Sequence, residues 1–185
     1  MLELESLITS RTRIKMLLKF FSNSNSSAYL REMAEEFGES TNSIRHELNN
    51  LSKAGYLLAS AQGRTIAYRA NTNHLLYPQL KNLVHKYLGF DAILENVVNK
   101  VVDRLGEVHA ACIVGDYAHG KDSGIIDLVL VGEIDQQYLQ NCIGKSEALI
   151  KRKIRSLVLS PPEFEANKTN LNIASAIWLW GNPSA

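Results

Sequence analysis

The stretch STNSIRHELNNL, residues 40–51, decides the fold of the first half of the chain. Ser40 or Thr41 can cap a helix by accepting a hydrogen bond from one of its first backbone N–H groups. The apolar residues that follow recur at helical spacing and form one face, which consists of Ile44, Leu48 and Leu51. The opposite face is polar and consists of Asn42, Arg45, His46 and Asn49. The spacing predicts an amphipathic helix whose polar face is exposed to solvent.

Two further helices are predicted before this one. Apolar residues fall on one helical face over residues 7–21, and the serine and asparagine run at 22–27 ends that pattern. A second, short apolar repeat extends from Leu30 to Phe37, and Gly38 can end it in the left-handed conformation. The predicted order is therefore a long helix, a short helix, a tight turn and the helix that starts near residue 40.

A β-hairpin is predicted after Gly55. The segments Tyr56–Ala59 and Ile66–Arg69 are typical of short strands, and residues 60–65 join them. Gly63 permits the positive φ that a tight turn needs, and Arg64 then lies at the tip. Three helices followed by a β-hairpin are typical of a winged helix-turn-helix domain, which we assign to residues 1–89.

Residues 74–88 are predicted to form a helix that links this domain to the rest of the chain. Large apolar side chains recur throughout the segment, and Gly89 follows it. So much apolar surface on one helix must cover either the second domain or a second subunit.

The two halves of the 185-residue chain differ in charge, although its net charge is only +1. Residues 1–89 hold 11 Lys and Arg against 7 Glu, whereas residues 90–185 hold 9 basic and 12 acidic residues. The cationic excess of the first half favours a polyanionic partner. No apolar run approaches the ~18 residues of a membrane span, and the first residues are acidic where a secretory signal is basic. We therefore expect a cytoplasmic protein that does not contact a membrane.

A small α/β domain is predicted for residues 90–185, so that the whole chain belongs to the α+β class. It begins with a helix over residues 91–105 that is apolar on more than one side. Strands are expected at residues 109–114, 125–131 and 154–159. The loop between the first two strands contains three glycines, Gly115, Gly120 and Gly124. Trp178 and Trp180 are expected to share one face of a last strand or amphipathic segment and to pack in the core.

Motifs along nearly the whole chain resemble those of prokaryotic winged-helix transcriptional regulators that are fused to a minimal nucleotidyltransferase-like domain. In the first half the motifs are SRTRI at 10–14, YLREMA at 29–34, SIRHEL at 43–48, LSKAGYL at 51–57 and YRAN at 68–71. In the second half Gly115, Ala118, Gly120 and Asp127-Leu128 stand where the nucleotidyltransferase motif has its loop and its acidic strand. The resemblance implies a DNA-binding regulator with a nucleotidyltransferase-like second domain.

The second half departs from that motif at the positions that carry its chemistry. The motif has a serine after the first glycine to help hold a triphosphate, but Asp116 stands there and would repel phosphate. Two carboxylates two residues apart are needed to share a pair of Mg²⁺ ions, but Ile125 replaces the first and leaves Asp127 alone. The strand at 154–159 offers Arg155 and Ser156 instead of a third acid. We expect a domain that is not an enzyme and that uses no metal or other cofactor.

The same loop keeps residues that can bind a ligand without catalysis. Gly115, Asp116, Gly120 and Asp127 are our candidates for contact with a nucleotide or small-molecule effector. One alternative is a rearranged metal site in which Asp116, Asp122 and Asp127 converge. Another is an active nucleotidyltransferase that uses the first domain for docking.

Double-stranded DNA is the partner that we expect for the first domain. Arginine can donate two hydrogen bonds to guanine and asparagine can pair with adenine, so bases would be read by Asn42, Arg45, His46 and Asn49. Phosphate contacts are expected from Arg31, Ser40, Thr41, Ser43 and Lys53. Arg64 would enter the minor groove or contact the phosphate backbone. One winged helix reads few base pairs, so we expect a homodimer; a protein-binding scaffold without DNA contact is the alternative.

Overall fold

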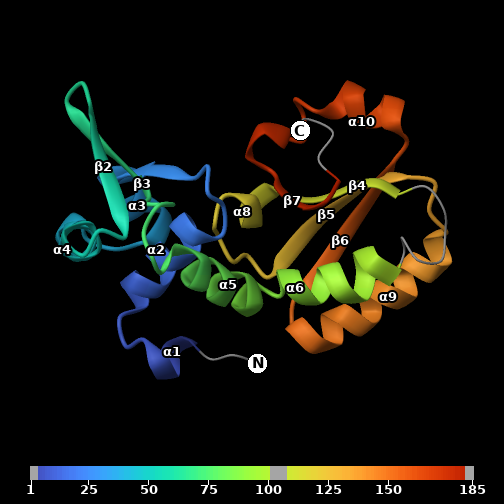
Figure 1. Cartoon of the computed structure of the whole chain (residues 1–185), viewed down its shortest axis with the longest axis horizontal. Helices are drawn as coiled ribbons and strands as arrows, with labels where there is room; N and C mark the ends of the chain where they lie inside the picture. Colours follow the sequence, from blue (N-terminus) through green and yellow to red (C-terminus); the bar gives the residue numbers. More distant parts are fainter. Residues whose placement is uncertain (1–3, 101–107, 182–185) are drawn as a thin grey trace. The chain divides into compact units, whose positions relative to one another are not determined.

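The computed structural model describes residues 4–100 and 108–181 of the chain (Figure 1). These residues form two compact units, one that ends at Val84 and one that begins at His85. Each unit contains helices and a sheet of its own. The protein therefore belongs to the α+β class, as its sequence predicts. Within the described residues no helix is both long and apolar enough to cross a membrane.

The first predicted helix, over residues 7–21, is in fact two helices, α1 (Leu4–Leu7) and α2 (Arg11–Phe21). The side chain of Ser10 accepts a hydrogen bond from the backbone N–H of Arg13 and thereby starts α2 at residue 11. Leu7, which the prediction placed on the apolar face, is 73% exposed. The prediction was wrong because Leu7 has the spacing of the apolar face of α2, although α2 begins only at residue 11.

Helices α3 (Leu30–Phe37) and α4 (Thr41–Lys53) confirm the predicted short helix and the helix after it. Gly38 ends α3 in the left-handed conformation at φ 65°. Ser40, rather than Thr41, caps α4, because its side chain accepts a hydrogen bond from the N–H of Ser43. The apolar face of α4 is buried and consists of Ile44, Leu48 and Leu51.

A three-stranded antiparallel sheet completes the first unit, in the order β1-β3-β2. Its strands are β1 (Ser27–Tyr29), β2 (Leu57–Gln62) and β3 (Thr65–Ala70). β1 was not predicted, and the hairpin strands β2 and β3 are longer than predicted because pairing continues to Gln62 and Thr65. Gly63 adopts φ 62° in the turn, and the hairpin tip projects away from the helices of this unit (Figure 1).

Helix α5 (Tyr77–Leu88) begins later than the predicted residue 74. His74 accepts hydrogen bonds before the helix starts, from the N–H of Leu76 to its ring Nδ1 and from the N–H of Tyr77 to its carbonyl. The Tyr77 ring packs against Phe21, with ring centroids 5.7 Å apart. Leu75 and Leu76 therefore lie before α5, and both are exposed.

The second unit contains the remaining elements. Helix α6 (Phe90–Ile93) begins one residue before the predicted helix over 91–105 and continues into the π-helical turn η1 (Leu94–Val98). Residues 101–105 of the predicted helix lie outside the described residues. The strands are β4 (Val108–Val114), β5 (Ile125–Gly132), β6 (Lys153–Leu159) and β7 (Ile177–Trp180). The other helical elements are α8 (Gly115–Ala118), α9 (Gln136–Ile150), α10 (Pro161–Asn167) and the 3-10 turn η2 (Ile173–Ser175). The predicted strands are confirmed, whereas α9 was not predicted.

The four strands form a mixed sheet in the order β6-β5-β4-β7. β5 and β6 are parallel and are joined through α9, whereas the other neighbouring strands are antiparallel. Side chains alternate between the two faces of the sheet, which lies between α10 on one side and α6 with α9 on the other (Figure 1). The core on the α10 side contains Ala110, Cys112, Val114, Val129, Val131 and Phe164.

The two tryptophans of β7 differ in burial. Trp178 packs against the core on the α10 side, as predicted. Trp180 is 41% exposed, contrary to the prediction. β7 is the edge strand of the sheet and Trp180 is its last residue, so fewer neighbours surround this side chain.

Candidate functional site

The polar residues that the sequence assigns to base reading lie together on one exposed face of α4. This face consists of Asn42, Arg45, His46 and Asn49, and Lys53 continues it one helical turn further on. Thr41 is exposed in the first turn of α4. Arg31, in the first turn of α3, and Arg64, at the hairpin tip, are exposed as well.

Two side chains of this face contact other side chains of the same helix. Nη1 of Arg45 donates to Oδ1 of Asn42 over 3.0 Å. Nδ1 of His46 lies 3.3 Å from Nδ2 of Asn50. Hydrogen bonds between exposed side chains are worth little in water, so these contacts can be exchanged for contacts with a ligand at small cost.

An ion pair on the buried side of α4 fixes the position of the helix. Glu47 is 7% exposed and accepts hydrogen bonds from Nε of Arg13 at 3.0 Å and from Oγ of Ser10 at 2.7 Å. This contact ties α4 to the start of α2. Our sequence interpretation gave Glu47 no role, although its place next to Leu48 on the apolar side of the helix was a signal of burial.

Two of the residues predicted to contact phosphate, Ser40 and Ser43, form hydrogen bonds within the protein through their hydroxyl groups. The Ser40 hydroxyl caps α4, and the Ser43 hydroxyl donates to the Glu39 carboxylate at 3.2 Å. Burial raises the pKa of Glu39, but hydrogen bonds from Thr12, Lys15 and Ser43 lower it by more, so that the pKa lies below its ordinary value. Glu39 is thus ionised at neutral pH and holds the Ser43 hydroxyl.

The cations of the first unit fall into two groups. Three of the four cations of α2 are paired with glutamates, in the ion pairs Arg13–Glu47, Lys15–Glu39 and Lys19–Glu36. The fourth, Arg11, is exposed at the start of the helix and has no carboxylate partner among the described residues. Among the described residues no carboxylate pairs with Arg31, Arg45, Lys53 or Arg64. The exposed Arg69 of β3 also has no carboxylate partner within the described ranges, and the sequence interpretation missed it. Arg69 lies in the second hairpin strand, two residues before Asn71, and nothing in that sequence indicated that its side chain is exposed.

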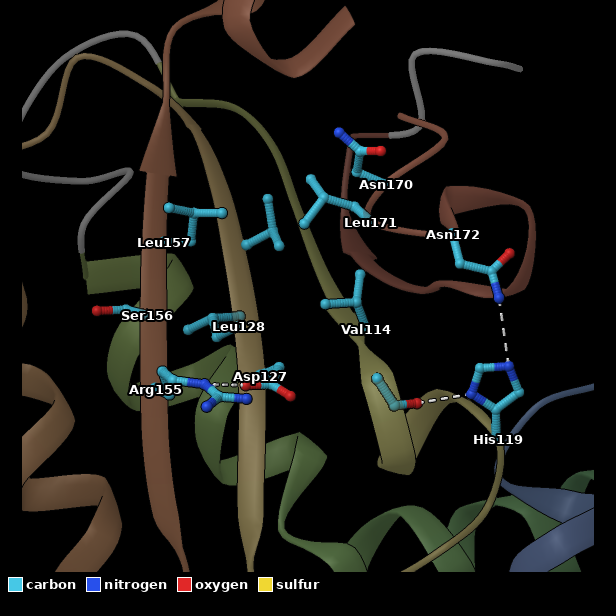
Figure 2. A pocket seen from close by; sticks show the side chains of 12 residues that line it. Val114, His119, Asp127, Leu128, Arg155, Ser156, Leu157, Asn170, Leu171 and Asn172 are labelled. Atoms are coloured by element: carbon cyan, nitrogen blue, oxygen red, sulfur yellow. Dashed lines mark hydrogen bonds and ion pairs between the residues drawn. The ribbon is translucent and has the colours of Figure 1, made fainter. Parts of the chain in front are cut away.

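A pocket of about 500 Å³ lies on the α10 face of the second sheet (Figure 2). Its apolar lining consists of Val114, Leu128, Val129, Leu157 and Leu171. Its polar lining consists of His119, Asp127, Arg155, Ser156, Asn170 and Asn172. Of the four predicted ligand residues, Gly115 and Asp127 line this pocket, whereas Asp116 and Gly120 do not.

Asp127 and Arg155 form an ion pair at one side of this pocket. They stand directly opposite each other in the parallel pair β5 and β6, and Arg155 Nε lies 2.5 Å from Asp127 Oδ1. A Cβ at Gly115 would lie 2.6 Å from the other carboxylate oxygen, Oδ2. Gly115 therefore keeps the space beside Oδ2 open, and its φ of 68° also favours glycine.

The three aspartates of the rearranged metal site do not converge. Asp122 instead binds Nη2 of Arg152 at 2.5 Å and accepts a hydrogen bond from the Tyr117 hydroxyl. Asp116 lies 3.8 Å from Nζ of Lys121, at the surface. In residues 4–100 and 108–181 no three His, Cys, Asp or Glu side chains are grouped as metal ligands.

Arg152 holds three elements of the second unit together. Its side chain is 9% exposed, and it donates to Asp122, to the carbonyl of Tyr87 at 3.0 Å and to that of Ile150 at 3.2 Å. The guanidinium also stacks on the Tyr87 ring, 5.1 Å from its centroid. Burial and the Asp122 carboxylate together raise the pKa of Tyr117 well above its ordinary value. This cluster is consistent with a structural role.

No protein-family model matches the chain, and no curated protein is similar to it in sequence.

Proposed function

We propose that the protein binds double-stranded DNA sequence-specifically and regulates transcription, with its first unit acting as a winged helix-turn-helix domain. The observation that carries this proposal is the separation of charges in the first unit. Three of the four cations on α2, all but Arg11, are neutralised by glutamates, whereas those on α3, α4 and the hairpin have no carboxylate partner among the described residues. Unpaired cations on one set of exposed elements favour a polyanion.

In the proposed complex, α4 enters the major groove with its exposed face toward the bases. Arg45 would donate two hydrogen bonds to a guanine, and Asn42 and Asn49 would pair with adenines, with His46 between them. Arg31, Thr41 and Lys53 would contact phosphates, and Ser40 would do so through its remaining hydroxyl hydrogen. We leave Ser43 out of the interface because its hydroxyl donates to Glu39. Arg64 would contact the neighbouring minor groove or its phosphates.

We further propose that the protein acts on DNA as a homodimer. A single helix in one major groove covers few base pairs, so useful specificity needs two half-sites. The exposed apolar side chains of Leu75 and Leu76, before α5, are suitable for a contact between subunits.

The substitutions Arg45→Ala and Arg64→Ala should affect DNA binding in different ways. On a site selected from a random DNA pool, Arg45→Ala should cost about 1–3 kcal/mol and relax the preference at one base position. Arg64→Ala should weaken binding to all sequences alike and reduce the slope of log K against log salt by ~0.9 if Arg64 contacts one phosphate. Fluorescence anisotropy over a salt series measures both effects.

Lys19→Ala is the matched control, because it removes one positive charge that Glu36 already neutralises at 2.7 Å. We expect it to change DNA affinity less than either arginine substitution. If Arg45→Ala and Arg64→Ala both leave affinity unchanged at low salt in folded protein, the first unit does not bind DNA through these elements. The protein-scaffold alternative would then be the better interpretation.

We also propose that the second unit does not transfer nucleotides. Among the described residues Asp127 is the one carboxylate that lines the pocket, and Arg155 occupies one of its oxygens. A pair of Mg²⁺ ions needs shared acidic ligands, and the positive charge of Arg155 opposes cation binding there. Assays with each of the four nucleoside triphosphates and Mg²⁺ or Mn²⁺ should therefore detect no transfer. Transfer that disappears in Asp127→Ala would overturn this interpretation in favour of an active nucleotidyltransferase.

A further inference from the structure

We propose that the pocket of the second unit binds a small zwitterion, an α-amino acid with an apolar side chain. The pocket has a volume of about 500 Å³, within the range of small-molecule sites. Figure 2 shows the Asp127–Arg155 pair at one side of it and His119 with Asn172 at the other, with apolar side chains between them. The site is therefore an apolar surface with opposite charges at one end.

Each partner of the ion pair keeps atoms that can bind a ligand, positively charged on Arg155 and negatively charged on Asp127. Arg155 uses Nε for Asp127, and among the described residues its Nη1 and Nη2 atoms have no hydrogen-bond partner. Asp127 uses Oδ1, and Oδ2 faces the space that the absent Cβ of Gly115 would fill. An α-carboxylate can accept from the guanidinium while the neighbouring α-ammonium donates to Oδ2. The adjacent charges of an α-amino acid thus match the adjacent charges of the pocket.

The rest of the pocket suits the side chain of such a ligand. Val114, Val129, Leu157 and Leu171 offer apolar contact, and Leu157 is 42% exposed. Covering this surface with an apolar side chain removes it from water. Over this apolar part of the lining a polar or charged side chain would lose hydration without a partner, since the polar side chains His119 and Asn172 lie at the far side of the pocket.

The charges of the lining argue against a nucleotide in this pocket. Of the Lys and Arg side chains in the described ranges, Arg155 alone lines the pocket, and Asp127 already neutralises it. Several negative phosphate charges would therefore meet no net positive charge, with Asp116 exposed next to Gly115. A zwitterion adds no net charge and so avoids this repulsion.

Isothermal titration calorimetry of the full chain tests the proposal without DNA, and so independently of the DNA-binding function. The probes are leucine and phenylalanine, together with two leucine analogues, 4-methylpentanoate without the ammonium and 3-methylbutylamine without the carboxylate. We expect at least one amino acid to bind, and leucine to bind about tenfold or more tighter than either analogue, because each analogue leaves one charged group unpaired. Failure of both amino acids to bind, or equal binding of leucine and its analogues, overturns the proposal. So does displacement of the amino acid by Mg²⁺-ATP.

Two substitutions separate specific contacts from a general effect on the pocket. In Arg155→Met, leucine should lose its advantage over 3-methylbutylamine; in Asp127→Asn, it should lose its advantage over 4-methylpentanoate. Lys153→Met is the matched control, since it removes a cation from the same strand that pairs with Glu147 and does not line the pocket. It should leave all affinities unchanged. If Arg155→Met and Asp127→Asn weaken all three ligands equally, the ion pair only shapes the pocket and the proposed recognition is wrong.

Discussion

Alanine at position 89 should destabilise the second unit by about 3 kcal/mol. Gly89 joins α5 to α6 at φ 84°, a left-handed conformation that costs an L side chain roughly 1–2 kcal/mol. The added Cβ would lie 2.6 Å from Cγ2 and 2.8 Å from Cβ of Ile150. Ile150 is buried and β-branched, so the overlap cannot be relieved by rotation, and it adds roughly 1–3 kcal/mol. Urea unfolding followed by tryptophan fluorescence measures this, because both tryptophans, Trp178 and Trp180, belong to the second unit.

Two other glycines serve as controls for this substitution. Gly38 has a similar positive φ of 65°, but nothing lies within 4 Å of an added Cβ, so alanine there should cost only the ~1–2 kcal/mol of conformation. Gly144 lies in the interior of α9 with open space around it, and alanine should stabilise that helix by roughly 0.5–1 kcal/mol. Because Gly38 lies in the first unit, its effect is read by circular dichroism. If Gly89→Ala costs no more than Gly38→Ala, the contact with Ile150 is not tight.

Asp122→Ala should also destabilise the second unit by about 3 kcal/mol at neutral pH. The substitution leaves the guanidinium of Arg152, which is 9% exposed, without its carboxylate partner. It also removes the acceptor of the Tyr117 hydroxyl, which lies within the fold. Glu165→Ala is the control, because Glu165 is 61% exposed in its pair with Lys168, and its loss should cost less than about 1 kcal/mol. Equal effects of the two substitutions would show that Arg152 does not depend on Asp122.

The contribution of Asp122 should depend on pH. Burial raises the pKa of its carboxyl, but hydrogen bonds from Arg152 and Tyr117 lower it by more, so that the pKa in the folded protein lies below its ordinary value. A carboxyl with a lowered pKa stabilises the fold in full above its unfolded pKa of about 4. That stabilisation is lost as the pH falls through the folded value. The difference in unfolding free energy between the wild type and Asp122→Asn should therefore shrink below about pH 4.

The elements that the sequence predicts well depend on patterns among residues that are close together in the chain. The face of α4, its cap at Ser40 and the turn at Gly38 each depend on residues a few positions apart. β1 is different, because three residues of a serine-rich stretch become a strand only by pairing with β3, far along the chain. The same applies to the length of β2, whose polar residues after Ala59 gain strand structure from pairing with β3.

The candidate sites show the same difference between local patterns and contacts that form only in the folded protein. The exposed residues of α4 were predicted together because one helix carries them all. The sequence also showed that Arg155 replaces an expected acid, but its contact with Asp127 depends on the register of β5 and β6, which are separated by α9. Likewise nothing local indicates that Arg152 contacts Asp122, Tyr87 and Ile150, since these residues meet only in the folded unit.

The order of strands in the two sheets has a consequence for synthesis on the ribosome. The first sheet is complete once Ala70 has left the exit tunnel, so the first unit can fold while the rest of the chain is still being made. In the second sheet Ala111 pairs with Trp180, and β4 therefore keeps an unpaired edge until β7 has emerged. Exposed strand edges are sites of aggregation, so the nascent second unit, rather than the first, is the part of this protein that most needs protection by chaperones.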